Sequence, residues 1–267
     1  MKGASLAVGA YSAMLFRSLI STAVLLPLWL LRGGHLPKGP LLRLHAVRGL
    51  NSAAMATSFF WGLKFLPLAE GMAISFIAPL IALYLAAVML GERIERRAVW
   101  ASLLGLAGVA VIAGARLSGD GYSRDAALGI AAILTSAVLY AWNLILQRQQ
   151  AQLAPPREVA TFQALFTSLF LAVLAPWLAQ LPGLPVWGHL AGAALLATVS
   201  LMLISWGYGR AETQVLLPLE YSAFIWAALM GWLMFDEALT GPTIIGAGLI
   251  VIGCWFSAKG HIEQVAL

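Results

Sequence analysis

The stretch AYSAMLFRSLISTAVLLPLWLL, residues Ala10–Leu31, is apolar along almost its whole length and carries one charge, Arg17. An α-helix rises about 1.5 Å per residue, so roughly 20 apolar residues span the hydrocarbon core of a bilayer. Similar runs recur through the chain, and we expect nine membrane-spanning helices. They cover Ala10–Leu31, Leu50–Leu66, Gly71–Leu90, Ala98–Ala115, Ala126–Leu146, Val159–Leu178, Leu190–Tyr208, Val215–Phe235 and Pro242–Ala258.

The composition of the chain agrees with this pattern. Of its 267 residues, 61% are hydrophobic and 10% are charged, whereas soluble domains carry about 25% charged residues. This composition excludes a soluble domain and a disordered chain, which would be polar and rich in charge. The apolar runs are continuous rather than alternating, which excludes a transmembrane β-barrel. The expected fold class is therefore an all-α polytopic membrane protein.

The positive charges predict how the helices are oriented in the membrane. The sixteen Lys and Arg residues are spread over short loops, not gathered in a basic arm, so we expect no nucleic-acid partner. Positive residues accumulate on the cytoplasmic side of membrane proteins. If the long connections Arg32–Gly49 and Arg148–Glu158 are cytoplasmic, eleven positive residues lie on that side and four on the other. We therefore expect the amino terminus outside and the carboxyl terminus inside.

Four short motifs occur twice in the same order, which indicates an internal duplication. Because five spans separate the two copies of each motif, the copies run in opposite directions through the membrane, as in the inverted repeats of many secondary transporters. We place the repeats at residues 1–118 and 119–267. The matched pairs are Leu15–Leu19 with Leu165–Leu169, Trp61-Gly62 with Trp206-Gly207, Leu90–Glu92 with Phe235–Glu237, and Leu103–Gly105 with Ile244–Gly246.

One predicted span, Ala126–Leu146, has no counterpart in the other repeat. The repeats therefore contain four and five helices, where symmetry would give five and five. We expect an in-frame hydrophobic segment of about 20 residues to be encoded before Met1. The alternative is a natural nine-helix variant.

Several of these stretches carry a resemblance to a known family. They are Phe16-Arg17, Ala78-Pro79 through Leu90-Gly91-Glu92, Gly105–Ala113, Pro218–Tyr221 through Phe235-Asp236-Glu237, and Gly246–Gly253. The chain resembles the EamA-like transporters of the drug/metabolite transporter superfamily, which have ten helices in two inverted five-helix repeats. It departs from them in lacking the first helix, and in having Asp236 where the first copy of the motif has Gly91.

The resemblance implies a secondary transporter of the bacterial inner membrane that exports small metabolites or toxic amphiphiles by alternating access. Its partners would be the lipid bilayer, a small-molecule substrate and, where transport is coupled, a proton or ion. The oligomeric state stays open. The alternatives are an intramembrane lipid-handling enzyme and an inactive truncated fragment.

Two charged residues inside predicted spans are candidates for substrate binding. A charge within the hydrocarbon costs roughly 2.5–3.5 kcal/mol on insertion scales, so Arg17 and Glu220 need a reason to be there. They can bind substrate, or they can pair with each other and hold helices together. Glu220 can also take up a proton, because desolvation favours the neutral form of a carboxyl group, and this makes it a candidate for proton coupling.

Two prolines within predicted spans are expected to break their helices. Pro79 removes the backbone bond to the carbonyl of Ser75, and Pro218 does the same for Gln214. Freed carbonyls near the midplane hold ions or polar substrates in transporters, although a kink alone is an equal alternative. The further substrate-binding candidates are Ser75, Asn143, Trp61, Trp206 and Tyr221. Asn143 is otherwise an interhelical hydrogen-bonding residue and the aromatics are otherwise interface anchors.

The sequence contains none of the common enzyme signatures. It has no Gly-x-Ser-x-Gly, His-Glu-x-x-His or phosphate-binding Gly-Lys-Ser/Thr motif, and its four histidines lie in loops or at span ends without clustering. We therefore expect no catalytic activity, no cofactor and no metal. Transport would be driven by a gradient.

The charge distribution leads to a prediction about topology. A reporter that fluoresces only in the cytoplasm, fused after Leu267, should be fluorescent, because eleven positive residues against four place the carboxyl terminus inside. The measurement is whole-cell fluorescence at a known expression level. A well-expressed fusion without fluorescence would contradict this orientation.

Overall fold

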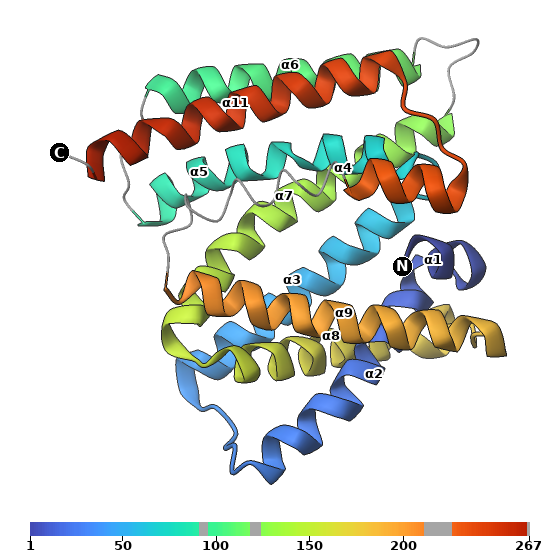
Figure 1. Ribbon diagram of the computed structural model, residues 1–267. Coiled ribbons are helices and arrows are strands. Elements are labelled where there is room, and N and C mark those ends of the chain that lie inside the picture. Colours follow the sequence, from blue (N-terminus) through green and yellow to red (C-terminus); the bar gives the residue numbers. More distant parts are fainter. Residues whose placement is uncertain (91–95, 118–123, 211–225, 266–267) are drawn as a thin grey trace. The chain divides into compact units, whose positions relative to one another are not determined.

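The computed structural model describes residues 1–90, 96–117, 124–210 and 226–265, and every regular element in these ranges is a helix (Figure 1). The predicted span Gly71–Leu90 differs from the structure, and the predicted span Val215–Phe235 lies only partly within the described residues, as explained below. The helices are α1 (Lys2–Val8), α2 (Ala10–Leu31), α3 (Gly39–Gly62), α4 (Leu68–Ser75), α5 (Ile77–Leu90), α6 (Arg96–Leu117), α7 (Arg124–Leu153), α8 (Pro156–Leu178), α9 (Leu184–Tyr208), the segment Trp226–Phe235, and α11 (Gly241–Val265).

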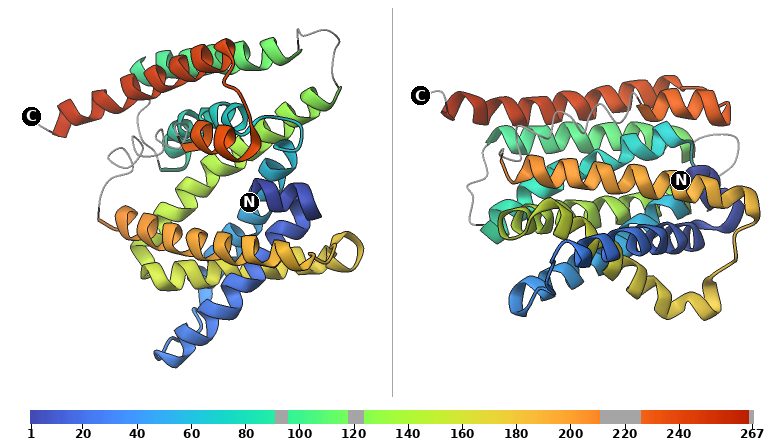
Figure 2. Two further views of the ribbon diagram at one scale, coloured as in Figure 1. Left: turned by 45° about the vertical axis from the view of Figure 1, so that its right-hand side comes forward. Right: turned by 60° about the horizontal axis from the view of Figure 1, so that its bottom comes forward.

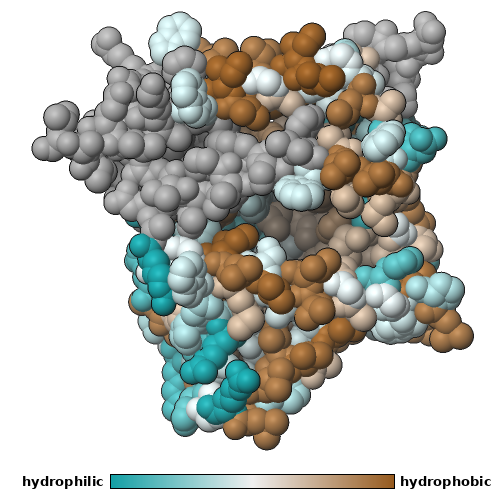
Figure 3. Space-filling view, viewed as in Figure 1, coloured by the Kyte–Doolittle hydropathy of each residue, from teal (hydrophilic) through white to brown (hydrophobic). Residues whose placement is uncertain are grey.

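The fold is that of an all-α polytopic membrane protein. Four of the described helices, α2, α7, α8 and α9, are long and apolar enough to cross a membrane. Large apolar side chains point outward from them: Leu195, Leu196 and Leu203 on α9 are all more than 60% exposed. Figure 3 shows that apolar residues cover much of the visible face of the molecule. Such an apolar surface is suited to contact with lipid.

The apolar runs predict the helices well, and their ends less well. The predicted span Ala10–Leu31 coincides with α2. The predicted span Gly71–Leu90 is interrupted at Phe76, which separates α4 from α5. Of the span Val215–Phe235, only Trp226–Phe235 lies within the described residues.

The two long connections were predicted as loops, and the structure corrects both. Helix α3 begins at Gly39, so His45 and Arg48 lie within a helix. Helix α7 continues to Leu153 and α8 begins at Pro156, which leaves Ala154 and Pro155 between them. Proline is tolerated at the start of α8 because the first helical N–H groups have no intrahelical partner. The apolar runs missed these helix ends because they are polar.

The helices form two compact units, and each unit takes helices from both halves of the sequence. Unit 1 comprises Met1–Trp61 and Leu146–Ala211, and unit 2 comprises Gly62–Ile145 and Glu212–Leu267. The repeat boundary after residue 118 divides the chain differently and stays a prediction.

In unit 1, α2 packs against α8, and these helices contain the first motif pair found in the sequence. Their contact has an apolar core and polar ends. Met14 and Leu15 of α2 pack against Ala53 of α3 and Leu171 of α8. Nearby, Ser12 Oγ accepts a hydrogen bond of 2.9 Å from the Gln180 N–H, and the Thr22 and Ser168 hydroxyls lie 3.3 Å apart. The two helices are therefore antiparallel. The short helix α1 packs beside them on α2 and α9.

In unit 2, α6 lies along α11, and these helices contain the fourth motif pair. Figures 1 and 2 show them side by side in every view. Their backbones approach closely at two glycines. A Cβ atom on Gly246 would lie 2.6 Å from the Gly108 carbonyl oxygen and 2.5 Å from Ile112 Cγ1. Small residues allow this approach, which supplies packing that the hydrophobic effect does not supply within lipid.

This contact predicts different effects for two alanine substitutions in α11. Gly246→Ala should lower the free energy of unfolding by about 1–3 kcal/mol, because the new methyl group forces α6 and α11 apart. Gly248→Ala is the matched control, since a Cβ there meets nothing within 4 Å. Alanine also favours a helix over glycine by up to about 1 kcal/mol, so the control should be neutral or stabilising. Thermal unfolding in detergent measures both, and equal effects would contradict the close contact.

Candidate functional site

Arg17 lies on α2 within the first predicted span, in unit 1. Its side chain is partly buried, and its Nε atom is buried without a hydrogen-bond partner among the described residues. The buried hydroxyl of Ser18 also lacks such a partner. One turn further on, Ser21 Oγ donates to the Ala194 carbonyl at 3.5 Å. This part of α2 is thus a polar stripe whose hydrogen-bonding capacity the fold uses only in part.

The two tryptophan candidates of unit 1 lie at helix ends. Trp61 is the next-to-last residue of α3 and is 39% exposed. Trp206 is 53% exposed, and the guanidinium of Arg210 lies 4.5 Å from its ring centroid. Arg210 also donates through Nη1 to the Trp206 carbonyl at 3.3 Å. A tryptophan held by an arginine at a helix end is typical of a membrane-interface anchor, so the structure favours that alternative for Trp206.

Two candidates of unit 2, Ser75 and Pro79, lie next to an interrupted helix. α4 ends at Ser75 and α5 begins at Ile77, two residues before Pro79. Ser75 Oγ donates to the Gly71 carbonyl at 2.8 Å, so its hydroxyl is occupied. Asn143 on α7 is 5% exposed. The remaining candidates, Glu220, Tyr221 and Pro218, lie outside the described residues, as does the predicted pairing of Arg17 with Glu220.

Two acidic side chains of unit 2 make hydrogen bonds at the start of α4. Glu237 Oε2 accepts a 2.7 Å hydrogen bond from the Leu68 N–H at the start of α4. The buried Glu70, in the first turn of α4, accepts a 3.3 Å hydrogen bond from Thr243 Oγ1 of α11. A carboxylate at a helix N-terminus satisfies an otherwise unpaired N–H and interacts favourably with the helix dipole. Both acids therefore have a structural role at the start of α4.

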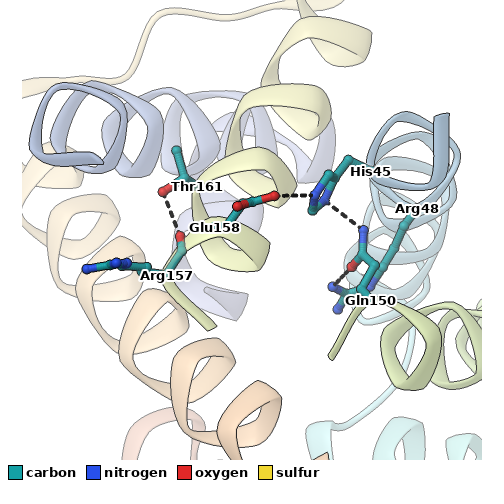
Figure 4. Close-up of polar contacts among 6 residues, drawn as sticks. All are labelled: His45, Arg48, Gln150, Arg157, Glu158 and Thr161. Carbon is teal, nitrogen blue, oxygen red and sulfur yellow. Dashed lines mark hydrogen bonds and ion pairs between the residues drawn. The ribbon is translucent and has the colours of Figure 1, made fainter. Parts of the chain in front are cut away.

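A buried polar network in unit 1 was not predicted from the sequence (Figure 4). Arg48 on α3 is 1% exposed and donates to the side-chain oxygens of two glutamines on α7. Its Nη2 atom lies 2.8 Å from Gln147 Oε1, and its Nη1 atom contacts Gln150 Oε1. Gln150 Nε2 in turn lies 2.9 Å from His45 Nδ1, and His45 Nε2 lies 3.5 Å from Glu158 Oε1 on α8.

The chemistry of Arg48 fixes the direction of every hydrogen bond in this network. A guanidinium only donates, so Gln150 must turn its oxygen to Arg48 and its amide nitrogen to His45. His45 Nδ1 then accepts, and the ring proton resides on Nε2, facing Glu158. Protonation of both ring nitrogens would set a donor against a donor. His45 precedes the apolar run of its span, and burial, followed by the positive charge of Arg48, lowers its pKa to about 4.

The network joins α3 to the junction of α7 and α8 within unit 1. All of its members except Glu158 are almost completely buried. The signal that reveals it is spacing: His45 and Arg48 are three residues apart, as are Gln147 and Gln150, and residues so spaced share a helix face. The network is suited to fixing helices, since Arg48 donates to acceptors on α7 and Gln150 connects Arg48 to His45.

The chain matches a known protein family. The model of the EamA-like transporter family matches residues 1–114 and 127–258. The chain belongs to the EamA-like transporter family. It is therefore a multi-pass transporter-type protein of the bacterial inner membrane, and the resemblance found in the sequence is confirmed.

Characterised EamA relatives cover most of the chain. The pseudopaline exporter CntI of Pseudomonas aeruginosa is 26% identical over 256 residues, 95% of this chain and 88% of that protein. The aromatic amino acid exporter YddG of Ancylobacter novellus is 30% identical over 199 residues, 73% of this chain and 68% of its own. A crystal structure with 24% identity covers 95% of this chain and 90% of that one with a TM-score of 0.69, which shows the shared fold.

The network leads to a prediction about stability. Arg48→Met should lower the free energy of unfolding by about 2–4 kcal/mol, because it leaves the oxygens of two buried glutamines unsatisfied. The matched control is Arg43→Met, on the same helix but exposed, which should change stability by less than about 0.5 kcal/mol. Thermal unfolding of the purified proteins in one detergent measures the difference. Similar melting temperatures for the two variants would show that the network does not stabilise unit 1.

Proposed function

We propose that this protein exports a small organic molecule from the cytoplasm across the inner membrane, driven by an ion gradient. The observation that carries the proposal is the match of the family model to almost the whole chain, together with relatives that are exporters. The named substrates of those relatives are pseudopaline and aromatic amino acids. These two classes are the first to test here.

The proposed mechanism is alternating access, in which the two repeats rock about a binding site near the membrane midplane. The motif pairs, which indicate inverted repeats, support this mechanism. The proposed topology is the amino terminus outside and the carboxyl terminus in the cytoplasm, as the charge distribution predicts. The substrate-binding candidates remain those named from the sequence.

The test is efflux from bacterial cells loaded with labelled phenylalanine, tyrosine, tryptophan or pseudopaline. Cells that express the protein should release at least one of these faster than cells with an empty vector. An uncoupler that collapses the proton gradient should abolish the difference. Gly248→Ala, a position with open space around it, serves as a variant that should retain full release.

Two other outcomes would favour the alternatives. Release at the empty-vector rate for every substrate, with the protein inserted at equal level, would favour an inactive fragment. Recovery of a chemically altered substrate would favour an enzyme. Either result would contradict the proposed function.

A further inference from the structure

Unit 1 contains a permanent positive charge that its own residues do not neutralise. Arg17 lies about seven residues into α2, and an arginine side chain does not lose its proton at physiological pH. Its Nε atom is buried and makes no hydrogen bond within the described residues. An unsatisfied buried donor costs roughly 1–3 kcal/mol. The arginine is therefore retained at a cost to the fold.

The sequence of unit 1 offers Arg17 only one carboxylate. Residues 1–61 contain no Asp or Glu, and residues 146–211 contain Glu158 alone. Glu158 faces His45 instead. Since α2 and α8 are antiparallel and Thr22 is level with Ser168, Glu158 lies ten residues beyond that level, or about 15 Å. Arg17 lies in the opposite direction along the pair, so Glu158 is not its counter-ion.

The surroundings of Arg17 on α2 have the mixed character of a site for an amphiphile. Ser18 carries a buried hydroxyl with no described partner, next to the arginine. Phe16 and Ile20, on either side in the sequence, pack against a small apolar cluster that includes Leu190 of α9. This cluster is buried and packed by the protein itself, whereas Leu19, two residues after Arg17, is 40% exposed. A charged head would meet Arg17, and an apolar body would meet exposed apolar side chains of α2 such as Leu19.

We infer that Arg17 binds the carboxylate group of the exported substrate, which is then an organic acid or amino acid with an apolar body. The inference rests on the proposed export function and specifies its substrate class. The two terminal guanidinium nitrogens can hold both oxygens of a carboxylate, which gives a paired, charge-assisted contact. An amide of the same shape makes no such contact, because it carries no negative charge.

The experiment compares acids with their amides on the purified full-length protein in detergent. The probes are 3-phenylpropanoate with 3-phenylpropanamide, L-phenylalanine with L-phenylalaninamide, and hexanoate with hexanamide, at constant ionic strength. Intrinsic tryptophan fluorescence reports both the melting temperature and the dissociation constant. For at least one pair, the acid should raise the melting temperature and should bind at least tenfold more tightly than the amide.

Two variants at the same position connect this preference to the guanidinium. Arg17→Gln should bind acid and amide equally, whereas Arg17→Lys, which keeps the charge, should retain a preference for the acid. Both are first checked for a single symmetric peak in size-exclusion chromatography. If Arg17→Gln does not fold, the acid-to-amide comparison in the unchanged protein and in Arg17→Lys still decides. Equal binding of all acids and amides, no binding of any acid, or an acid preference that survives in Arg17→Gln would overturn the inference.

The efflux assay separates this inference from the export function itself. If Arg17→Gln releases substrate as fast as the unchanged protein, export stands and the carboxylate site is wrong. If acids bind through Arg17 while no substrate is released, the site stands and the export function is wrong. If acids bind only after Glu220→Gln, an internal carboxylate neutralises Arg17, and the inference is overturned for the natural protein.

Discussion

The buried guanidinium of Arg48 is the interaction on which the arrangement of unit 1 depends. A charge in a packed helical interior is tolerated only when each of its donors finds an acceptor. Arg48 donates to two acceptors on α7. The second of these, Gln150, donates to His45, whose other ring nitrogen faces Glu158. Because a guanidinium cannot accept a hydrogen bond, no hydrogen bond in this series can reverse its direction. Three helices are fixed by one directional set of contacts.

Unit 2 meets the same need for specific contacts by a different means. Within lipid, apolar surfaces gain little from meeting one another, so shape and hydrogen bonds must select the partner of each helix. Along α6 and α11 the selection is by shape, with Gly108 and Gly246 letting the backbones approach. Around α4 the selection is by charge, because Glu237 accepts a hydrogen bond from the Leu68 N–H at the start of the helix and Glu70 accepts one from Thr243 of α11.

Much of the fold could be predicted from apolar runs, because length and hydrophobicity are what the bilayer selects. The run Ala10–Leu31 coincides with α2 for this reason. The start of α3 and the end of α7 could not be predicted in this way, since His45, Arg48 and the glutamines make them polar. Their helical nature shows only in the three-residue spacing that puts these side chains on one face. Arg17 could be predicted as a candidate site because a charge within an apolar run is conspicuous.

Arg48 and Arg17 of unit 1 contrast a charge that holds helices with the charge that we propose binds substrate. Arg48 donates to two acceptors from its own unit, and these contacts hold α3 to α7. Arg17 has the same chemistry and stands in a more apolar segment, yet its Nε has no hydrogen-bond partner among the described residues. A charge that the described fold does not use is available to act on a molecule outside the fold. In a transporter family the molecule that arrives from outside the fold is the substrate.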